Sequence, residues 1–188
     1  MEYVLTSNTV SHAIAEQIHE WIPTIDIARW RTSMRGGIIF ETRPLNIFTE
    51  LSQFDPNDRT VYPYVFIRSL GIISRNRERK GNVERYFYNY TFAITFYVDI
   101  SPTDRMQVPR INEELDSFEL KLTRVLRSVE IWDDEVQVFV TPPPQKSDGV
   151  LHFFISVPVY EDTMPPEYEK MENLEQNIST MQKMEVDI

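Results

Sequence analysis

Hydrophobic residues recur at helical spacing near the start of the chain, three or four positions apart. These positions are Val10, Ile14, Ile18 and Trp21. Thr6, Ser7 and Asn8 are candidate N-caps, and Pro23 ends the pattern. The sequence therefore predicts an amphipathic helix of about four turns, with one face packed on a core.

The apolar period changes to two between residues 25 and 43, with Gly36 and Gly37 between the two halves. This alternation predicts a strand, a turn and a second strand. In the next segment, the apolar spacing from Ile47 to Leu51 allows one short helix. An Asp-Pro-Asn-Asp loop at residues 55–58 follows it.

The middle of the chain carries the longest alternation. Residues 61–73 are rich in Tyr, Val and Ile, and Pro63 is expected near the beginning of a strand or on an edge. The polar segment at residues 74–83 contains a Gly81-Asn82 turn signal. We expect a long antiparallel hairpin with a charged tip that projects from the domain and one aromatic face. That face is formed on the return strand, residues 84–100, by Tyr86, Tyr88, Tyr90, Phe92, Ile94, Phe96 and Val98.

A second helix is predicted at residues 111–129, where acidic residues lie early, basic residues lie late and Pro109 suits the first turn. Residues 135–140 and 150–160 alternate as strands that can pair across the intervening loop. Pro158 places the end of the last strand near an edge. The sequence thus predicts an α+β fold, a mostly antiparallel sheet with a long hairpin packed against two main helices.

The composition changes after residue 160. Residues 161–188 hold eight acidic and two basic side chains, a formal charge of −6 that leaves −4 of the total −10 for residues 1–160. A lone amphipathic segment is marginally stable in water, so we expect this arm to be ordered by lying on another surface, as an oligomer contact. The predicted organisation is a domain at 1–162 and an acidic C-terminal arm at 163–188. The apolar positions of the arm are Tyr168, Met171, Leu174, Ile178 and Met181.

Composition excludes several classes of protein. The chain has 188 residues, of which 41% are hydrophobic and 26% charged, as in an ordinary globular domain. It contains no cysteine, which excludes disulfides and thiolate nucleophiles. A net charge of −10 argues against a freestanding DNA-binding domain. Because no membrane span and no signal peptide are apparent, we expect a soluble intracellular protein without membrane contacts.

Candidate catalytic and metal-binding groups are few. His12, Glu16 and His19 share one helix face, but a single stripe cannot close a tetrahedral metal site, and a polar helix face is the simpler interpretation. His152 is expected to be packed or at an interface. The acidic clusters at 113–116 and 133–135 are interpreted as helix-dipole chemistry and as a turn. Phosphate-binding and hydrolase motifs are absent from the sequence, so we predict no catalytic site, cofactor or metal.

The hairpin tip is the one basic feature of the chain. Between residues 68 and 85, six basic side chains accompany two acidic ones. Two interpretations remain open: a solvated loop that blocks edge aggregation, or a surface that meets phosphates or an acidic partner. On an acidic protein, an acidic partner such as the arm of a neighbouring copy fits better than readout of DNA sequence. The predicted partner-binding residues are Arg75, Arg77, Arg79, Lys80 and Arg85.

Three segments resemble the tail terminator, or tail-completion, proteins of tailed bacteriophages. They are the Tyr-Pro-apolar strand at residues 62–67, the long helix at 111–129 and the Asp-Gly-Val-Leu-His run that begins the strand at 148–152. The similarity, which includes the order of the elements, covers residues 8–160. The loop at 43–60 and the acidic arm do not align with the family.

The resemblance implies a structural virion protein and no catalytic residues. Its implied form is a homo-oligomeric, commonly hexameric ring that caps the finished tail tube and joins it to the head-side neck. The implied partners are the tail tube protein, the neck or connector protein and, in a contractile tail, the sheath protein. Genomic DNA would pass through the lumen without sequence-specific binding.

The implied location is the tail–neck junction of the virion, after assembly in the host cytoplasm. Two alternatives stay open beside the tail terminator. One is another head–tail connector or neck protein, which would also form rings with arms. The other is a non-phage adaptor that binds an acidic partner through its basic hairpin.

Overall fold

The structure of the chain is a computed structural model. It describes residues 6–31, 36–53, 55, 58–81, 83–98, 111–132, 134–140, 143–147 and 149–160. The acidic arm, with its five apolar positions, lies outside these residues, and so does Pro109. None of the helices in the described part is long and apolar enough to cross a membrane.

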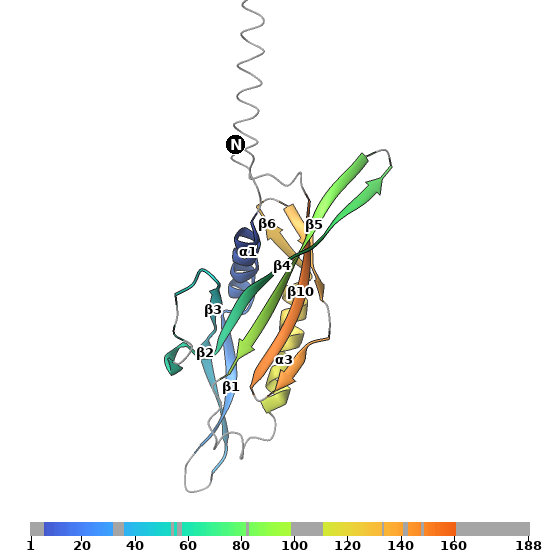
Figure 1. Cartoon of the computed structure of the whole chain (residues 1–188). Helices are drawn as coiled ribbons and strands as arrows, with labels where there is room; N and C mark the ends of the chain where they lie inside the picture. Colours follow the sequence, from blue (N-terminus) through green and yellow to red (C-terminus); the bar gives the residue numbers. More distant parts are fainter. Residues whose placement is uncertain are drawn as a thin grey trace, which may run out of the picture.

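The fold is α+β, as the sequence predicts (Figure 1). The described residues contain two α-helices, α1 (Ser7–Trp21) and α3 (Ile111–Val125), and a short 3₁₀ helix, η1 (Arg59–Val61). The strands are β1 (Thr24–Trp30), β2 (Ile38–Pro44), β3 (Asn46–Thr49), β4 (Tyr64–Lys80), β5 (Val83–Tyr97), β6 (Ser128–Ile131), β7 (Asp134–Gln137), β8 (Phe139–Val140), β9 (Gln145–Ser147) and β10 (Val150–Tyr160).

In the described part of the chain, six strands form the main sheet, in the order β3-β4-β5-β10-β8, with β9 also paired to β10. The long pairs β4–β5 and β5–β10 are antiparallel, and β3 is parallel to β4. Two smaller antiparallel pairs, β1–β2 and β6–β7, lie outside this sheet. The two strands predicted at residues 25–43 are thus confirmed as β1 and β2, while residues 32–35 of the predicted turn lie outside the described residues.

One face of the main sheet packs against both helices and forms the core. Alternate residues of β5 and β10 are buried there, because successive side chains of a strand point to opposite faces. At the centre of this layer, the rings of Phe118 on α3 and Phe96 on β5 stack with their centroids 3.9 Å apart. The helices contribute Val10, Ile14 and Ile18 from α1 and Leu115, Phe118 and Leu122 from α3.

Helix α1 begins and ends where the sequence predicts. The hydroxyl of Thr6 accepts a hydrogen bond from the backbone N–H of Thr9, as an N-cap does. The prediction for the core face is wrong at one position, since the Trp21 side chain is 68% exposed. Trp21 is the last residue of the helix, and the residue that follows it, Ile22, is buried in the core instead.

The short helix expected around residues 47–51 is a strand instead. β3 pairs in parallel with the beginning of β4, from Asn46 opposite Tyr64 to Thr49 opposite Ile67. The Asn46 amide also donates a hydrogen bond of 2.7 Å to the Val61 carbonyl. Helical spacing of two apolar residues could not reveal that the edge of β4 offers backbone partners, and pairing with them determines the conformation.

The long hairpin is confirmed, with 17 residues in β4 and 15 in β5. Pro63 directly precedes β4, consistent with a proline near the beginning of the strand. The pairing register shifts twice, between Ser69 and Gly71 and between Ile72 and Ser74. Gly71 adopts a φ of 95° at the first shift, a conformation that favours glycine. Such bulges bend and twist a strand, which suits a hairpin that leaves its sheet.

Helix α3 is shorter than predicted. It ends at Val125, and Val129 belongs to the strand β6, although its side chain is buried as the helical spacing suggested. The acidic turn predicted between helix and strand lies instead inside the β6–β7 hairpin, where Trp132 adopts a φ of 57°. Burial of Val129 is compatible with either conformation, so the pattern alone could not locate the end of the helix.

The predicted strand at 150–160 is β10, whereas the one predicted at 135–140 is divided into β7 and β8. Only β8 pairs with β10 as expected, with Val140 opposite Ile155, and β7 pairs with β6 instead. β10 is paired to β5 as far as Tyr160. On its other side, no described strand pairs with β10 beyond Ser156. Pro158, which has no N–H to donate, therefore lies near an edge, as predicted.

The acidic cluster at residues 113–116 does more than complement the helix dipole. A Glu114 carboxylate oxygen accepts a hydrogen bond of 2.7 Å from the Ala28 backbone N–H, which ties α3 to β1. Asp116 and Glu119 both bind the Lys146 ammonium group, which ties α3 to β9. Hydrogen bonds to Asp116 and then Glu119 raise the pKa of Lys146 above its ordinary value of 10.5.

Lys146→Met is expected to lower the free energy of unfolding by up to about 1 kcal/mol near neutral pH, since the pair is at the surface. A raised lysine pKa stabilises the fold below the ordinary value, and that contribution is lost as pH rises through the folded-state pKa. The difference between wild type and variant should therefore shrink above a pH of about 10.5 in urea titrations. The exposed Lys121, changed to Met, is the control, and a difference that persists at high pH would contradict the assignment.

Candidate functional site

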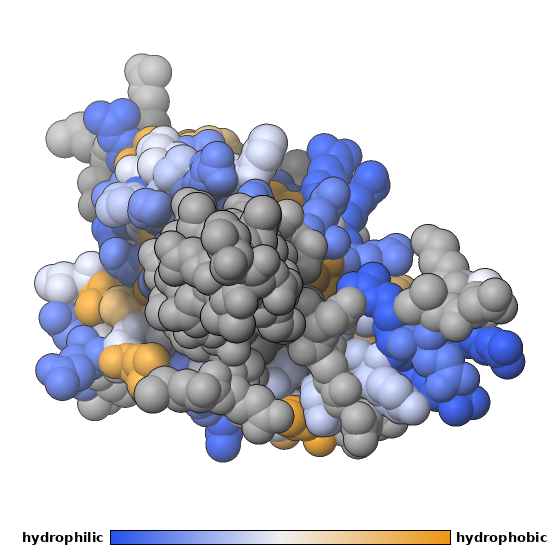
Figure 2. All heavy atoms as spheres, turned by 90° about the horizontal axis from the view of Figure 1, so that it is seen from above, coloured by the Kyte–Doolittle hydropathy of each residue, from blue (hydrophilic) through white to orange (hydrophobic). Residues whose placement is uncertain are grey.

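The β4–β5 hairpin extends beyond the body of the domain (Figure 1). β10 accompanies β5 only as far as the Tyr160–Phe87 pair, so the hairpin beyond that pair is a ribbon of two strands. Seen from above, hydrophilic residues gather at the right edge, where this ribbon projects (Figure 2). A two-stranded ribbon has little stability of its own in water. The tip, defined as residues 75–86, is thus a charged projection that the core does not require.

The pairing register divides the predicted basic residues of the tip between two faces. Directly opposed residues of an antiparallel pair share a face. On one face, Arg75, Arg77 and Arg79 lie opposite Tyr88, Tyr86 and Glu84. On the other face, Lys80 and Arg85 lie opposite Val83 and Glu78. The side chains of Arg75 and Lys80 are outside the described part of the structure, and their faces follow from the backbone register alone.

Arg85 is engaged within its own chain at the foot of the tip. Its guanidinium carbon lies 4.2 Å from the centre of the Tyr160 ring, in a cation–π contact. The Tyr160 hydroxyl donates a hydrogen bond of 2.9 Å to Glu78, and the ring also packs against Phe87. Tyr160 thus anchors the foot of the ribbon to the main sheet.

Arg77 and Arg79 make weaker contacts on the opposite face. An Arg77 nitrogen lies 3.5 Å from a Glu84 oxygen, and Arg79 donates a hydrogen bond of 3.3 Å to the Gly81 carbonyl. Each of these contacts uses one nitrogen of an exposed guanidinium, which carries five N–H donors. The other N–H donors of Arg77 and Arg79 are on an exposed ribbon that projects from the domain, where a second molecule can reach them.

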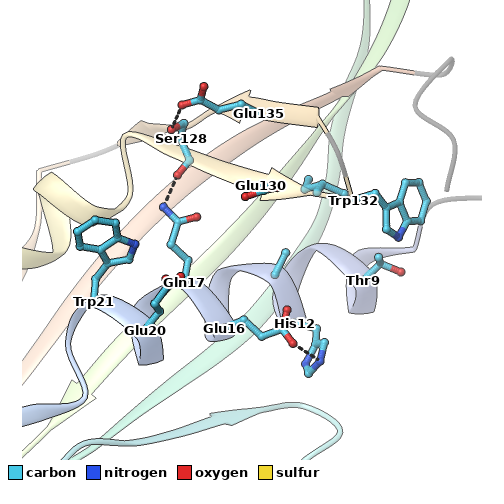
Figure 3. A pocket seen from close by; sticks show the side chains of 12 residues that line it. Thr9, His12, Glu16, Gln17, Glu20, Trp21, Ser128, Glu130, Trp132 and Glu135 are labelled. Atoms are coloured by element: carbon cyan, nitrogen blue, oxygen red, sulfur yellow. Dashed lines mark hydrogen bonds and ion pairs between the residues drawn. The ribbon is translucent and has the colours of Figure 1, made fainter. Parts of the chain in front are cut away.

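A groove of about 830 Å³ lies between α1 and the β6–β7 hairpin (Figure 3). Two tryptophans lie at its ends and four glutamates between them, and none of the described residues that line it is Lys or Arg. Carboxylates gathered in a concave surface create a negative potential there. The defining residues of this acidic groove are Glu16, Glu20 and Trp21 from α1 and Glu130, Trp132 and Glu135 from the β6–β7 hairpin.

Gln17 joins the two walls of the acidic groove. Its side-chain amide donates hydrogen bonds of 2.7 Å to the carbonyls of Val125 and Ser128. The first is a carbonyl of the last turn of α3, which has no partner within its own helix. The Ser128 hydroxyl in turn donates a hydrogen bond of 2.5 Å to a Glu135 oxygen. These bonds hold α1 against β6 and give the groove a defined shape.

Two of the three histidines lie on the exposed surface of α1, and the third lies in β10. His12 Nε2 lies 3.2 Å from a Glu16 oxygen on the exposed face of α1, and His19 is also exposed. His152 is half-buried, with its Nδ1 atom 3.3 Å from the Thr95 hydroxyl. Among the described residues, no group of three or more His, Asp or Glu side chains is placed to hold a metal ion.

Large apolar side chains are exposed on the β1–β2 hairpin, at the end of the molecule opposite the tip (Figure 1). Ile38, Ile39 and Phe40 follow one another on β2, and Phe40 is 72% exposed. Because successive residues of a strand point to opposite faces, these three side chains expose apolar surface on both faces of β2. Exposed apolar patches on a folded domain commonly mark contacts with other proteins.

The acidic groove is absent from the predictions made from sequence. Glu16 is interpreted there as part of a polar helix face and Glu135 as part of a turn, and nothing links two segments more than a hundred positions apart. Trp21 lies at one end of the groove, but its helical spacing in the sequence predicts a core residue. No local pattern therefore indicates the groove. A scan against protein-family models and a search of curated proteins both find no match for this chain. A functional proposal therefore rests on the residues and their geometry.

Proposed function

We propose that this chain is a structural virion protein, a ring-forming tail terminator that caps a phage tail tube and joins it to the head-side neck. The observation that carries the proposal is the pair of two-stranded ribbons at opposite ends of one packed domain (Figure 1). One ribbon, β1–β2, exposes apolar side chains, and the other, the tip, carries charge. β1 gives Ile25 and Ile27 to the core, but β2 exposes its apolar side chains and the tip lies beyond the core, so both ribbons offer surface for contacts between molecules.

A ring is a natural product of such a domain. When two different surfaces of one protein fit each other, the contact repeats head to tail, and it closes into a ring if the rotation is right. A terminator also needs one side for the finished tube and another for the neck. Two projections with different chemistry, apolar and basic, supply two such sides. In this proposal, genomic DNA passes through the lumen of the ring, and a contractile tail adds contacts with its sheath.

A second candidate function draws on the tip alone. The guanidinium groups of Arg77 and Arg79 would suit an adaptor that binds an acidic partner and has no ring. The two functions differ in what the purified protein does without a partner: the terminator assembles, and the adaptor stays a monomer. A neck protein would share the ring but would not stop a growing tube.

We expect the purified full-length chain to form closed rings, visible by negative-stain electron microscopy, with a single mass several times that of the monomer by analytical ultracentrifugation. A monomer across the whole accessible range of concentration would contradict the terminator and favour the adaptor. Addition of the rings to polymerising tail tube protein distinguishes a terminator from a neck protein. A terminator stops elongation at one ring per tube end, whereas a neck protein leaves tube length unchanged.

A further inference from the structure

The tip and the acidic groove of this chain have complementary chemistry. The tip carries Arg77 and Arg79 on one face of a ribbon, and the groove carries four carboxylates and no lysine or arginine among its described lining residues. We propose that the tip of one copy docks in the acidic groove of the next copy and forms the ring contact. This inference rests on the proposed ring and names the two surfaces that would build it.

The spacing of the charged groups favours such a contact. Residues two apart on a strand lie about 7 Å apart on one face, which applies to Arg77 and Arg79. Residues four apart on a helix are neighbours about 6 Å apart, which applies to Glu16 and Glu20 on the wall of the groove. Two guanidiniums of the ribbon can therefore meet two carboxylates of the helix at the same time.

The tryptophans at the ends of the groove add to the fit. Arginine binds carboxylates through paired N–H donors and also stacks on aromatic rings, most favourably on tryptophan. Trp21 is largely exposed at one end of the groove, and Trp132 lies at the other (Figure 3). The chain already uses this stacking at the foot of the tip, between Arg85 and Tyr160. Carboxylates flanked by indoles are a receptor for an arginine-bearing segment.

The tip meets a groove only on another copy. Figure 1 shows the end of the hairpin well separated from α1 and the β6–β7 hairpin of its own chain. A tip and a groove are different surfaces, so their contact is heterologous and can propagate around a ring. Among the described residues that line the groove, His12 is the one basic side chain, and it lies beside Glu16. The groove itself therefore offers little positive charge to its carboxylates.

Charge reversal tests the contact directly. The tip variant is Arg77→Glu with Arg79→Glu, and the groove variant is Glu20→Arg with Glu130→Arg. Each variant alone should weaken association between copies roughly tenfold to a hundredfold, because like charges then face each other. A mixture of the two variants should recover association, since reversed tips then meet reversed grooves. Ultracentrifugation at low and high salt measures both, and high salt should weaken the wild-type contact.

The controls separate a specific contact from net charge. Lys121→Glu with Arg124→Glu changes the charge by the same amount on the exposed side of α3 and should leave association intact. The acidic C-terminal arm is the other surface that could receive the tip. Neutralisation of the eight acidic residues of 161–188 in the full chain tests that alternative. If the arm receives the tip, that variant loses association and the groove variant keeps it, which would overturn the proposal.

A measurement without rings keeps the inference distinct from the proposed function. At a dilution where the chain is monomeric, a backbone-cyclised peptide of residues 75–86, whose closure holds the two strands together, should bind the protein and change its tryptophan fluorescence. The same peptide with both arginines changed to glutamate should not bind. If the tip variant forms normal rings, the docking proposal is wrong and the terminator proposal stands. If the peptide binds but the protein never forms rings, the terminator proposal is wrong and the docking proposal stands.

Discussion

Phe118→Ala is expected to lower the free energy of unfolding by about 3–5 kcal/mol, the largest effect of any substitution considered for this chain. Phe118 is buried at the centre of the core, and its ring stacks on Phe96 with 3.9 Å between centroids. The substitution removes that contact and leaves a cavity between α3 and β5, which packed neighbours can fill only in part. Urea denaturation followed by circular dichroism measures the loss.

Leu120 on the same helix provides the matched control. Its side chain is 61% exposed, so Leu120→Ala should change stability by no more than about 0.5 kcal/mol. Loss of less than about 1 kcal/mol in Phe118→Ala would mean that α3 does not pack on the sheet as described. Such a result would also remove the support that α3 gives to the β6–β7 wall of the acidic groove.

Gln17→Ala is expected to cost about 2 kcal/mol of unfolding free energy, because the carbonyls of Val125 and Ser128 both lose their donor. Gln17→Glu should be at least as harmful near neutral pH, since a carboxylate cannot donate to either carbonyl. Because Gln17 joins the walls of the groove, both variants should also weaken association between copies. Thermal and urea denaturation measure the first effect and ultracentrifugation the second.

Glu16, the preceding residue, is the control for Gln17. Its side chain is exposed and contacts only His12 among the interactions described, so Glu16→Ala should leave stability nearly unchanged. The two sites then differ in a useful way. A stability loss at Gln17 without any change in association would separate the shape of the groove from its proposed role as a receptor for the tip.

Much of the fold could be predicted from sequence where one face of an element is buried along its whole length. The alternation from Tyr90 to Val98 correctly places β5 in the core, and the spacing of Val10, Ile14 and Ile18 correctly orients α1. The spacing from Ile47 to Leu51 suggests a short helix where the chain forms the strand β3, because so few residues contain too little periodicity. Its conformation depends on the backbone groups of β4, which a local pattern does not describe.

The candidate site also has features that the sequence predicts and features that it does not. Arginines in the tip and the turn at Gly81-Asn82 are local features, and the sequence shows both. The acidic groove is not local, since α1 and β6 are more than a hundred residues apart and meet only because both pack on the same core. The exposed position of Trp21, between the buried Ile18 and Ile22, likewise depends on the neighbours that the packed core places around the end of α1.

By itself, the sequence determined an α+β domain with a long hairpin, two amphipathic helices and a basic tip, because burial and charge along each element repeat with its period. Only the tertiary structure decided that β3 is a strand, that the tip has two different faces and that four glutamates and two tryptophans share a groove. These features depend on contacts between distant segments, and such contacts are selected by the packing of the whole core. The periodicity of any one segment carries no information about them.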